Sequence, residues 1–286
     1  MKPYMTISIE IEDMVEFSWG EEMKLNNRYI GAAIIAPFIL FIFLGGIWLK
    51  GFAIVLSVLG LYEFYNALRE KKFNPIPIVG YILIAAFYAT NNNFQYLMYI
   101  VVLVAIALLM IPIINLKYTF IDAAITLLGF LYVGILFGFM PLISNKEGGQ
   151  YLIWLIFLGS WICDTTAYYS GKYLGKKKLC PKVSPKKTIA GAVGGFLGST
   201  IGCGIYGIIV SSYVPHVEVI HFFLIGALCG IMGQFGDLVA SSIKRYVGIK
   251  DYSNLIPGHG GILDRFDSIL FNSAVVFYYL TFIVRI

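Results

Sequence analysis

The sequence predicts an all-α, polytopic integral membrane protein with about nine transmembrane helices. Of the 286 residues, 59% are hydrophobic and only 13% are charged, whereas ordinary soluble domains carry about 25% charged residues. Apolar stretches of about 20 residues, the length that crosses a hydrocarbon core about 30 Å thick, recur along most of the chain. Nine such helices are enough to bury a polar site between them.

The predicted spans are separated by short polar connections. They cover residues 30–48, 51–68, 75–91, 94–115, 119–143, 150–171, 189–212, 217–243 and 267–286. Gly45–Gly46, followed by Lys50–Gly51, allows the first two spans to form a tight hairpin, and the break at 91–93 is short. We therefore divide the chain into a polar lead, an N-terminal region of about five helices and a C-terminal catalytic region of about four, covering residues 1–28, 29–149 and 150–286.

The polar lead and the cysteines add little to the functional argument. Residues 1–28 contain six acidic side chains and no basic start followed by a short apolar run, so we expect a disordered or surface-lying segment rather than a secretory signal. An expression remnant would look similar. Cys163, Cys180, Cys203 and Cys229 lack metal-like spacing, and we interpret them as small apolar residues without disulfides.

The basic residues predict how the chain is oriented. With the N-terminus in the cytoplasm and nine alternating spans, 18 of the 21 lysines and arginines fall on the cytoplasmic side. Only Lys50, Lys146 and Arg285 remain outside. The positive-inside rule strongly favours this orientation. We expect a protein of the cytoplasmic membrane with its C-terminus outside and its basic loops facing cytoplasmic nucleotides. An alternative role would explain several of these lysines: they would only set the topology and contact anionic lipid headgroups.

Carboxylates inside predicted spans are costly and usually functional. For Glu63 and Asp122 we favour structural pairing or interfacial exposure. Asp164 and Asp237 differ, because each shortly precedes a basic loop that contains glycines. These two aspartates are therefore candidate site residues.

A second pair of aspartates follows the loop after Asp237. If a helix restarts after Gly260–Gly261, Asp264 and Asp267 lie at positions i and i+3 on one face. Two such carboxylates favour a cation between them, and Mg²⁺ is commonly held by one or two carboxylates plus substrate phosphates. Asp237 can approach the same point from a neighbouring helix, so we predict a metal site formed by Asp237, Asp264 and Asp267.

The loop before this helix is suited to phosphate. Residues 257–261 read Pro-Gly-His-Gly-Gly, which cannot continue a helix. Its glycines would let phosphates approach the main chain, and the following helix start would present free N–H groups. His259 is interpreted either as a phosphate contact, as a proton shuttle or as a packed polar residue.

A second polar constellation runs from Asp164 to Gly191. Its basic loop leads into a helix near Thr188, where Ser184 or Thr188 could cap the helix or contact phosphate. Lys186 and Lys187 could neutralise a triphosphate. Nucleotide chemistry needs metal ligands and cations in one place, so this loop gains meaning beside the acidic residues.

These residues resemble the signature of the phosphatidate cytidylyltransferase family, also called CDP-diglyceride synthetases. The resemblance rests on Ser242 to Arg245, Lys250–Asp251 and the run from Pro257 to Asp267, with both internal gaps preserved. Asp164, Gly171, Gly175–Lys176 and the run Ser184–Thr188 look like the family's second common block. The closely similar region is about 160–268. Ala190 departs from the pattern, because family members often carry an acidic residue there.

The resemblance implies an enzyme that converts CTP and phosphatidic acid to CDP-diacylglycerol and pyrophosphate for phospholipid biosynthesis. It implies a Mg²⁺ requirement, a second, monovalent cation such as K⁺ in some members, and homodimers; we expect no nucleic-acid partner. Asp237, Asp264 and Asp267 would hold the metal and, with Lys244 and Arg265, carry out catalysis. The substrate-binding candidates are Asp164, Lys186, Lys187, Thr188, Lys244, Arg245, Lys250 and His259.

Other functions remain open from the sequence. Intramembrane carboxylates and broken helices also mark ion-coupled transporters, although the polar residues here gather at one side and no internal repeat is visible. A related transferase could use another lipid phosphate, such as an ether-lipid or isoprenoid analogue, or another nucleotide. A prenyl-transferring enzyme would not need the Ser-Pro-Lys-Lys loop, and the aspartate pattern of a CDP-alcohol phosphotransferase is absent. A purely structural membrane protein would not gather these acids, bases and glycines.

Overall fold

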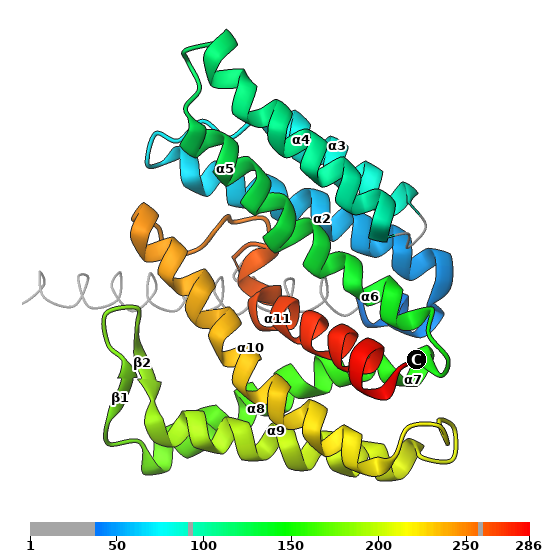
Figure 1. Ribbon diagram of the computed structural model, residues 1–286. Helices are drawn as coiled ribbons and strands as arrows, with labels where there is room; N and C mark the ends of the chain where they lie inside the picture. Colours follow the sequence, from blue (N-terminus) through cyan, green and yellow to red (C-terminus); the bar gives the residue numbers. More distant parts are fainter. Residues whose placement is uncertain (1–37, 91–93, 257–259) are drawn as a thin grey trace, which may run out of the picture.

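The computed structural model describes residues 38–90, 94–256 and 260–286 (Figure 1). Apart from one small β-hairpin, the regular elements of these residues are helices joined by loops. A helix at 38–44 is followed by α2 Gly46–Arg69, α3 Pro77–Ala89, α4 Phe94–Ile114, α5 Phe120–Gly129, the π-helical turn η1 Phe130–Ile135, α6 Leu136–Ser144, α7 Gly149–Leu152, α8 Trp154–Leu174, β1 Lys178–Cys180, β2 Ser184–Thr188, α9 Ile189–Val210, α10 Val219–Val247, α11 Leu263–Tyr279 and the π-helical turn η2 Leu280–Val284.

The all-α membrane class is confirmed, whereas the number of nine spans is not. Within the described residues, six helical segments are long and apolar enough to cross a membrane: 46–69, 95–114, 120–144, 189–210, 219–247 and 263–284. Helix α3 has only 13 residues. Helix α8 has 21 residues, but Asp164, Lys172 and several hydroxyl side chains interrupt its apolar character. The sequence therefore indicates the class more firmly than the number of crossings.

The first described helix folds back on α2 as a hairpin. Gly45 has a φ of 58°, in the left-handed region that glycine adopts without steric cost. The rings of Phe38 and Phe41 lie 5.0 and 5.1 Å from the ring of Phe52 on α2. The tight hairpin is therefore present, but its second helix begins at Gly46 rather than at residue 51.

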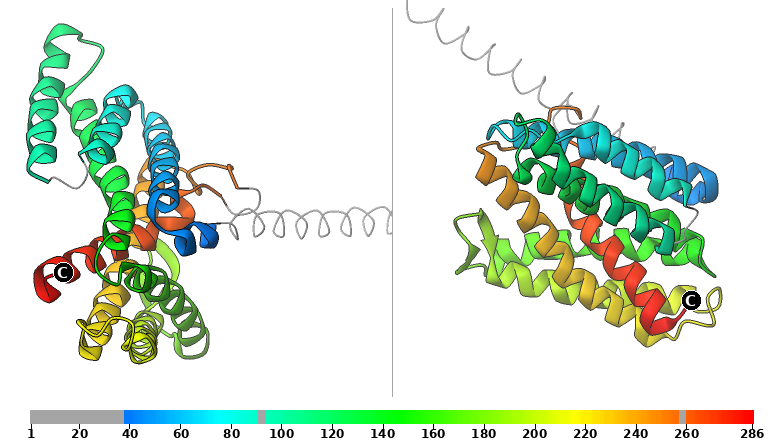
Figure 2. Two further views of the ribbon diagram at one scale, coloured as in Figure 1. Left: turned by 90° about the vertical axis from the view of Figure 1, so that its right-hand side faces the viewer. Right: turned by 45° about the horizontal axis from the view of Figure 1, so that its top comes forward.

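Helix α11 lies between two groups of helices. On one side, α8, α9 and α10 pack closely together, and on the other side α11 contacts α6 and α2 (Figures 1 and 2). Leu263, Leu270, Val276 and Leu280 are fully buried in this central position. Helix α4 stands at the edge, with only 11% of its apolar stretch buried, as expected of a helix that faces lipid. The first residues of α11 are thus held from both sides.

The basic loop between α8 and α9 contains a β-hairpin that the sequence did not predict. Strands β1 and β2 are antiparallel, with Lys178 opposite Thr188 and Cys180 opposite Ser184. Thr188 then caps α9, because its hydroxyl accepts a hydrogen bond from Gly191 N at 3.1 Å. The predicted capping role of Thr188 is confirmed, and the lysines before it are held on a strand rather than on an irregular loop.

The structural expectations for Asp122 and the cysteines are confirmed. Asp122 forms a capping box with Thr119 at the start of α5, and its Oδ1 accepts a hydrogen bond from Asn74 N at 2.6 Å. This carboxylate joins the α2–α3 loop to α5 and belongs to the scaffold. All four cysteines have free thiols.

Candidate active site

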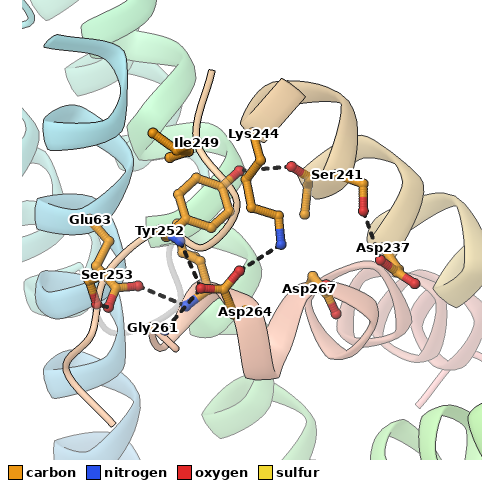
Figure 3. Close-up of polar contacts among 12 residues, drawn as sticks. Glu63, Asp237, Ser241, Lys244, Ile249, Tyr252, Ser253, Gly261, Asp264 and Asp267 are labelled. Atoms are coloured by element: carbon orange, nitrogen blue, oxygen red, sulfur yellow. Dashed lines mark hydrogen bonds and ion pairs between the residues drawn. The ribbon is translucent and has the colours of Figure 1, made fainter. Parts of the chain in front are cut away.

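The three predicted aspartates lie where α10 and α11 meet. Asp237 projects from α10, and Asp264 and Asp267 project from the first turn and a half of α11 (Figure 3). A Cβ atom on Gly236 would lie 2.5 Å from Asp267 O, so only glycine allows the two backbones to approach this closely. The sequence predicted that these residues approach one another, and the close helix contact brings Asp237 and Asp267 together.

Asp264 is fully engaged by the protein. Its Oδ1 accepts a bond from Lys244 Nζ at 2.6 Å, and its Oδ2 accepts bonds from Tyr252 N at 2.8 Å and Gly261 N at 2.9 Å (Figure 3). The Asp264 side chain is only 3% exposed. It therefore fixes Lys244 and both ends of the loop between α10 and α11.

Tyr252, in the loop between α10 and α11, covers the buried ion pair of Lys244 and Asp264. Its ring lies 5.5 Å below Lys244 Nζ, and its hydroxyl donates to Ala240 O at 3.4 Å. Burial away from water raises the pKa of Tyr252 well above its usual range, and the charges of Tyr132 and Asp264 act in the same direction. Tyr252 thus stays a neutral donor at all physiological pH values.

Glu63 of α2 closes the start of α11. Its carboxylate is buried and accepts hydrogen bonds from Ser253 Oγ at 2.6 Å and from Ile262 N and Leu263 N at 2.9 Å each (Figure 3). A Cβ atom on Gly261 would lie 2.5 Å from Glu63 Oε1. Structural pairing, one of the two roles favoured for Glu63, is confirmed. The carboxylate binds the loop between α10 and α11, here called the signature loop, and the start of α11.

This contact corrects the expectation that the α11 start offers free N–H groups to phosphate. The N–H groups of Ile262 and Leu263 donate to Glu63, and that of Gly261 donates to Asp264. The positive end of the helix dipole is thereby compensated by carboxylates of the protein. These three N–H groups are therefore not available to a phosphate.

A cavity of about 430 Å³ opens beside Asp237. It is bounded by α8, by the β-hairpin, by the start of α9 and by α10. Its cationic lining comes from Lys172, Lys178, Lys186 and Lys187, and its carboxylates are Asp164 and Asp237. Lys187 Nζ lies 2.6 Å from Asp237 Oδ2, an ion pair that joins the lysine-rich hairpin to the aspartates of the helix crossing.

The structure separates the predicted substrate-binding residues, together with the predicted catalytic residue Arg265, into three groups. Asp164, Lys186, Lys187 and Thr188 line the cavity, whereas Lys244 is buried against Asp264. Arg245 is exposed and donates to Ile249 O at 3.3 Å, at the end of α10. Lys250 and Arg265 are also exposed and do not line the cavity. His259 lies outside the described residues.

Several cavity residues were missed by sequence reasoning. Gln234 precedes Asp237 by one helical turn and lines the cavity, and its amide donates to Ala192 O at 3.1 Å and Gly230 O at 2.6 Å. Lys172 and Lys178 were counted only as topological charges. The spacing of Gln234 and Asp237 on one helix face was a usable signal, whereas the position of Lys178 depended on the hairpin.

The donor chemistry suits Mg²⁺ only in part. Across the described residues, no three His, Cys, Asp or Glu side chains are arranged to hold a metal ion. Asp237 and Asp264 each form an ion pair with a lysine. The carboxylate of Asp267 accepts one bond, from its neighbour Ser268 N at 2.7 Å, and the charges that act on it are those of Asp237, Lys244 and Asp164. Mg²⁺ often needs only one or two carboxylates when phosphates supply other ligands. Asp237 and Asp267 would supply two such carboxylates, and sharing of one ion by all three aspartates stays a prediction.

The fold and the site together define a class of protein: an integral membrane enzyme with a lysine-rich cavity beside a carboxylate cluster, as expected for transfer of a nucleotidyl group. The family model for the cytidylyltransferase family matches residues 26–283. The chain belongs to the cytidylyltransferase family, and it is therefore a CTP-dependent transferase.

Relatives with curated names match over most of the chain. A phosphatidate cytidylyltransferase of Staphylococcus haemolyticus is 34% identical over 257 residues, which cover 87% of this chain and 95% of the relative. One of Bacillus subtilis is 32% identical over 271 residues, covering 90% and 98%. One of Staphylococcus epidermidis is 36% identical over 257 residues, covering 87% and 95%. The resemblance to that family, first noted in the signature residues, is confirmed for the whole helical region.

Proposed function

We propose that this enzyme transfers the cytidylyl group of CTP to phosphatidic acid, giving CDP-diacylglycerol and pyrophosphate. The observation that carries the proposal is the cavity in which four lysines stand beside Asp164 and Asp237. A triphosphate needs several cations, and a metal-assisted transfer needs carboxylates at the same place. The names of the relatives supply the lipid substrate.

The reaction we propose is an in-line displacement at the α-phosphorus of CTP. A phosphate oxygen of the lipid forms the new bond to this phosphorus, and the bond from it to the bridging oxygen of the β-phosphate breaks. Pyrophosphate leaves with that electron pair. The attacking oxygen is already anionic at neutral pH, so the enzyme needs little general-base catalysis and mainly positions its substrates and offsets their charge.

The side chains of the cavity would divide this work. Lys186 and Lys187 on β2, together with Lys172 and Lys178, would hold the phosphates of CTP. Lys187 would exchange its contact with Asp237 for a phosphate oxygen as the nucleotide enters, which frees the Asp237 carboxylate. Lys244 would stay fixed by Asp264 and add positive charge from the last turn of α10.

We propose that the carboxylates of this site bind a divalent metal ion when substrate phosphates supply further ligands. Mg²⁺ would be held by Asp237 and Asp267 together with phosphate oxygens, and by Asp264 only if Lys244 gives up its contact. When bound, the ion would polarise the α-phosphate and offset the charge of the leaving group. A second, monovalent cation such as K⁺ belongs to the same proposal.

We further propose that the site faces the cytoplasm, with the N-terminus inside and the C-terminus outside. The β-hairpin, the end of α10 and the start of α11 lie together at one end of the bundle, and the C-terminus lies at the other (Figure 1). Most lysines and arginines belong to loops at the former end, as the positive-inside rule requires.

In this orientation CTP would enter from the cytoplasm, and phosphatidic acid would enter between helices from the bilayer. We also propose that two copies of the chain form a homodimer.

The function is tested by incubating purified protein with labelled CTP, Mg²⁺ and phosphatidic acid in mixed micelles. We expect a labelled lipid and an equal amount of pyrophosphate. Parallel reactions with an ether-linked phosphatidic acid and with an isoprenoid phosphate test the related transferases. Labelled product with the isoprenoid phosphate but not with phosphatidic acid would contradict the proposal, as would ion flux in proteoliposomes without consumption of CTP.

Replacing Lys187 with glutamine should raise the KM for CTP about tenfold or more, because one charge-assisted contact to phosphate is lost. The matched control is Lys182→Gln, which removes an exposed lysine from the same hairpin, outside the cavity. Initial rates measured against CTP at saturating phosphatidic acid check both variants. Equal KM values for the two variants would remove Lys187 from the nucleotide site.

A further inference from the structure

Tyr132 carries a buried hydroxyl that has no hydrogen-bond partner among the described residues. The residue is only 9% exposed. A buried donor without a partner is unfavourable, and native structures contain few of them. Such a group therefore calls for an explanation.

Other buried tyrosines of the described chain do have partners. The hydroxyl of Tyr65 donates to Thr126 O at 2.6 Å, that of Tyr88 pairs with Ser57 Oγ at 3.2 Å, and that of Tyr252 donates to Ala240 O at 3.4 Å. The helices of this protein thus satisfy deeply placed phenols as a rule. Among the tyrosines that the structure describes, Tyr132 is the exception.

The surroundings of Tyr132 connect it to the crossing of α10 and α11. Its ring lies 5.7 Å from that of Phe64 and 6.4 Å from that of Phe271, both in edge-on arrangements. Phe271 packs against Gly236, where a Cβ atom would lie 3.1 Å from the Phe271 ring and 2.5 Å from Asp267 O. The phenol is therefore one aromatic ring away from the helix crossing that carries the aspartates.

The backbone at this position is also unusual. Residues 130–135 form the π-helical turn η1 inside an otherwise continuous α5–α6 helix. Single π-helical turns within α-helices are less stable than the regular helix and are frequently found at functional sites. Here the turn carries Tyr132 toward α11 from the side of the N-terminal helices, opposite the lysine-lined cavity.

We propose that the Tyr132 hydroxyl is a further catalytic group, which donates a hydrogen bond to a substrate phosphate oxygen at the aspartate site. This rests on the proposed function. A phosphate placed beside three carboxylates needs hydrogen-bond donors. A neutral phenol supplies one and forms no ion pair with the carboxylates, whereas a lysine does. In-line displacement places the attacking and leaving groups on opposite sides of the phosphorus. Because the cavity takes the triphosphate, the phosphate nearest Tyr132 is that of the attacking lipid.

The test is Tyr132→Phe, which removes one oxygen and leaves the ring. We expect kcat/KM for phosphatidic acid to fall about 10- to 100-fold, the loss of one hydrogen bond to a charged group. The melting temperature in detergent should stay equal to that of the wild type or rise, because an unpaired buried donor is removed. The control is Tyr88→Phe, a similarly buried tyrosine with a partner, which should lower the melting temperature and leave turnover unchanged.

Separate titrations of the two substrates assign the contact. A loss confined to the lipid supports the lipid phosphate, and a loss confined to CTP moves the contact to the nucleotide and overturns the assignment. Unchanged kinetics, or a melting temperature below that of Tyr88→Phe, would overturn the proposal, since the latter would reveal a structural partner.

The proposed function can fail separately. If wild-type protein makes no lipid-linked nucleotide, stabilisation by phosphatidic acid alone still measures the contact. In that case wild-type protein should be stabilised by the lipid and Tyr132→Phe clearly less, and equal stabilisation of the two would overturn the proposal.

Discussion

Replacing Asp267 with asparagine should lower kcat for CDP-lipid formation by at least about 100-fold, the scale expected for losing a major transition-state contact. Asp267 is the aspartate best placed to act on substrate or metal. Its carboxylate accepts only the Ser268 N–H among the described residues, whereas Asp237 and Asp264 are each paired with a lysine. Steady-state rates of purified protein with labelled CTP and saturating phosphatidic acid measure the effect.

The control for Asp267→Asn is Glu218→Gln, which removes the same charge at the exposed far end of α10. This control should keep wild-type activity. Both variants should melt at temperatures close to that of the wild type, because neither carboxylate holds distant parts of the chain together. Turnover by Asp267→Asn within about threefold of the control would contradict a role at the reaction centre.

Replacing Glu63 with alanine should destabilise the protein by about 3 kcal/mol or more and should also abolish most of its activity. Three donors, Ser253 Oγ and the N–H groups of Ile262 and Leu263, would lose their buried acceptor. An unpaired buried donor costs about 1–3 kcal/mol. Because these donors lie in the loop and the first turn that carry Asp264, loosening them displaces the aspartates as well.

Chemical or thermal unfolding in detergent, combined with the CTP assay, checks this prediction. Glu70→Ala is the matched control, since Glu70 is exposed just beyond the end of the same helix. Glu63→Gln should be intermediate, because its carbonyl oxygen can still accept a bond while its amide group opposes the N–H donors. A Glu63→Ala protein as stable as the Glu70→Ala control would show that the signature loop holds itself in place.

The sequence was a good guide wherever local chemistry decided the outcome. The apolar stretches indicated the membrane class, because only helices satisfy their own backbone in lipid. The restart of a helix after Gly261 followed from the turn-forming residues before it. Thr188 was one of two candidate caps, with Ser184, because capping depends on neighbouring residues. The signature residues indicated the family, and the match over residues 26–283 confirmed it.

The expectations that the structure did not confirm depend on contacts between residues that are far apart in the sequence. The basic loop between α8 and α9 pairs its strands across a turn, and hydrogen bonds between strands leave little trace in such a lysine-rich segment. The start of α11 seemed open to phosphate because its blocking group, Glu63, is 200 residues away from Leu263 in the chain. The number of nine spans is not confirmed, because length and hydropathy alone do not determine which helices cross the bilayer.

By itself, the sequence determined that the chain folds into helices within a membrane and that its polar residues belong to a cytidylyltransferase. Only the tertiary structure decided that Lys187 faces Asp237, that Asp264 is enclosed by its own loop and that the buried Tyr132 hydroxyl has no partner among the described residues. The reason is distance along the chain. Helix formation depends on neighbours within a few residues, whereas these contacts depend on how helices from different parts of the chain cross.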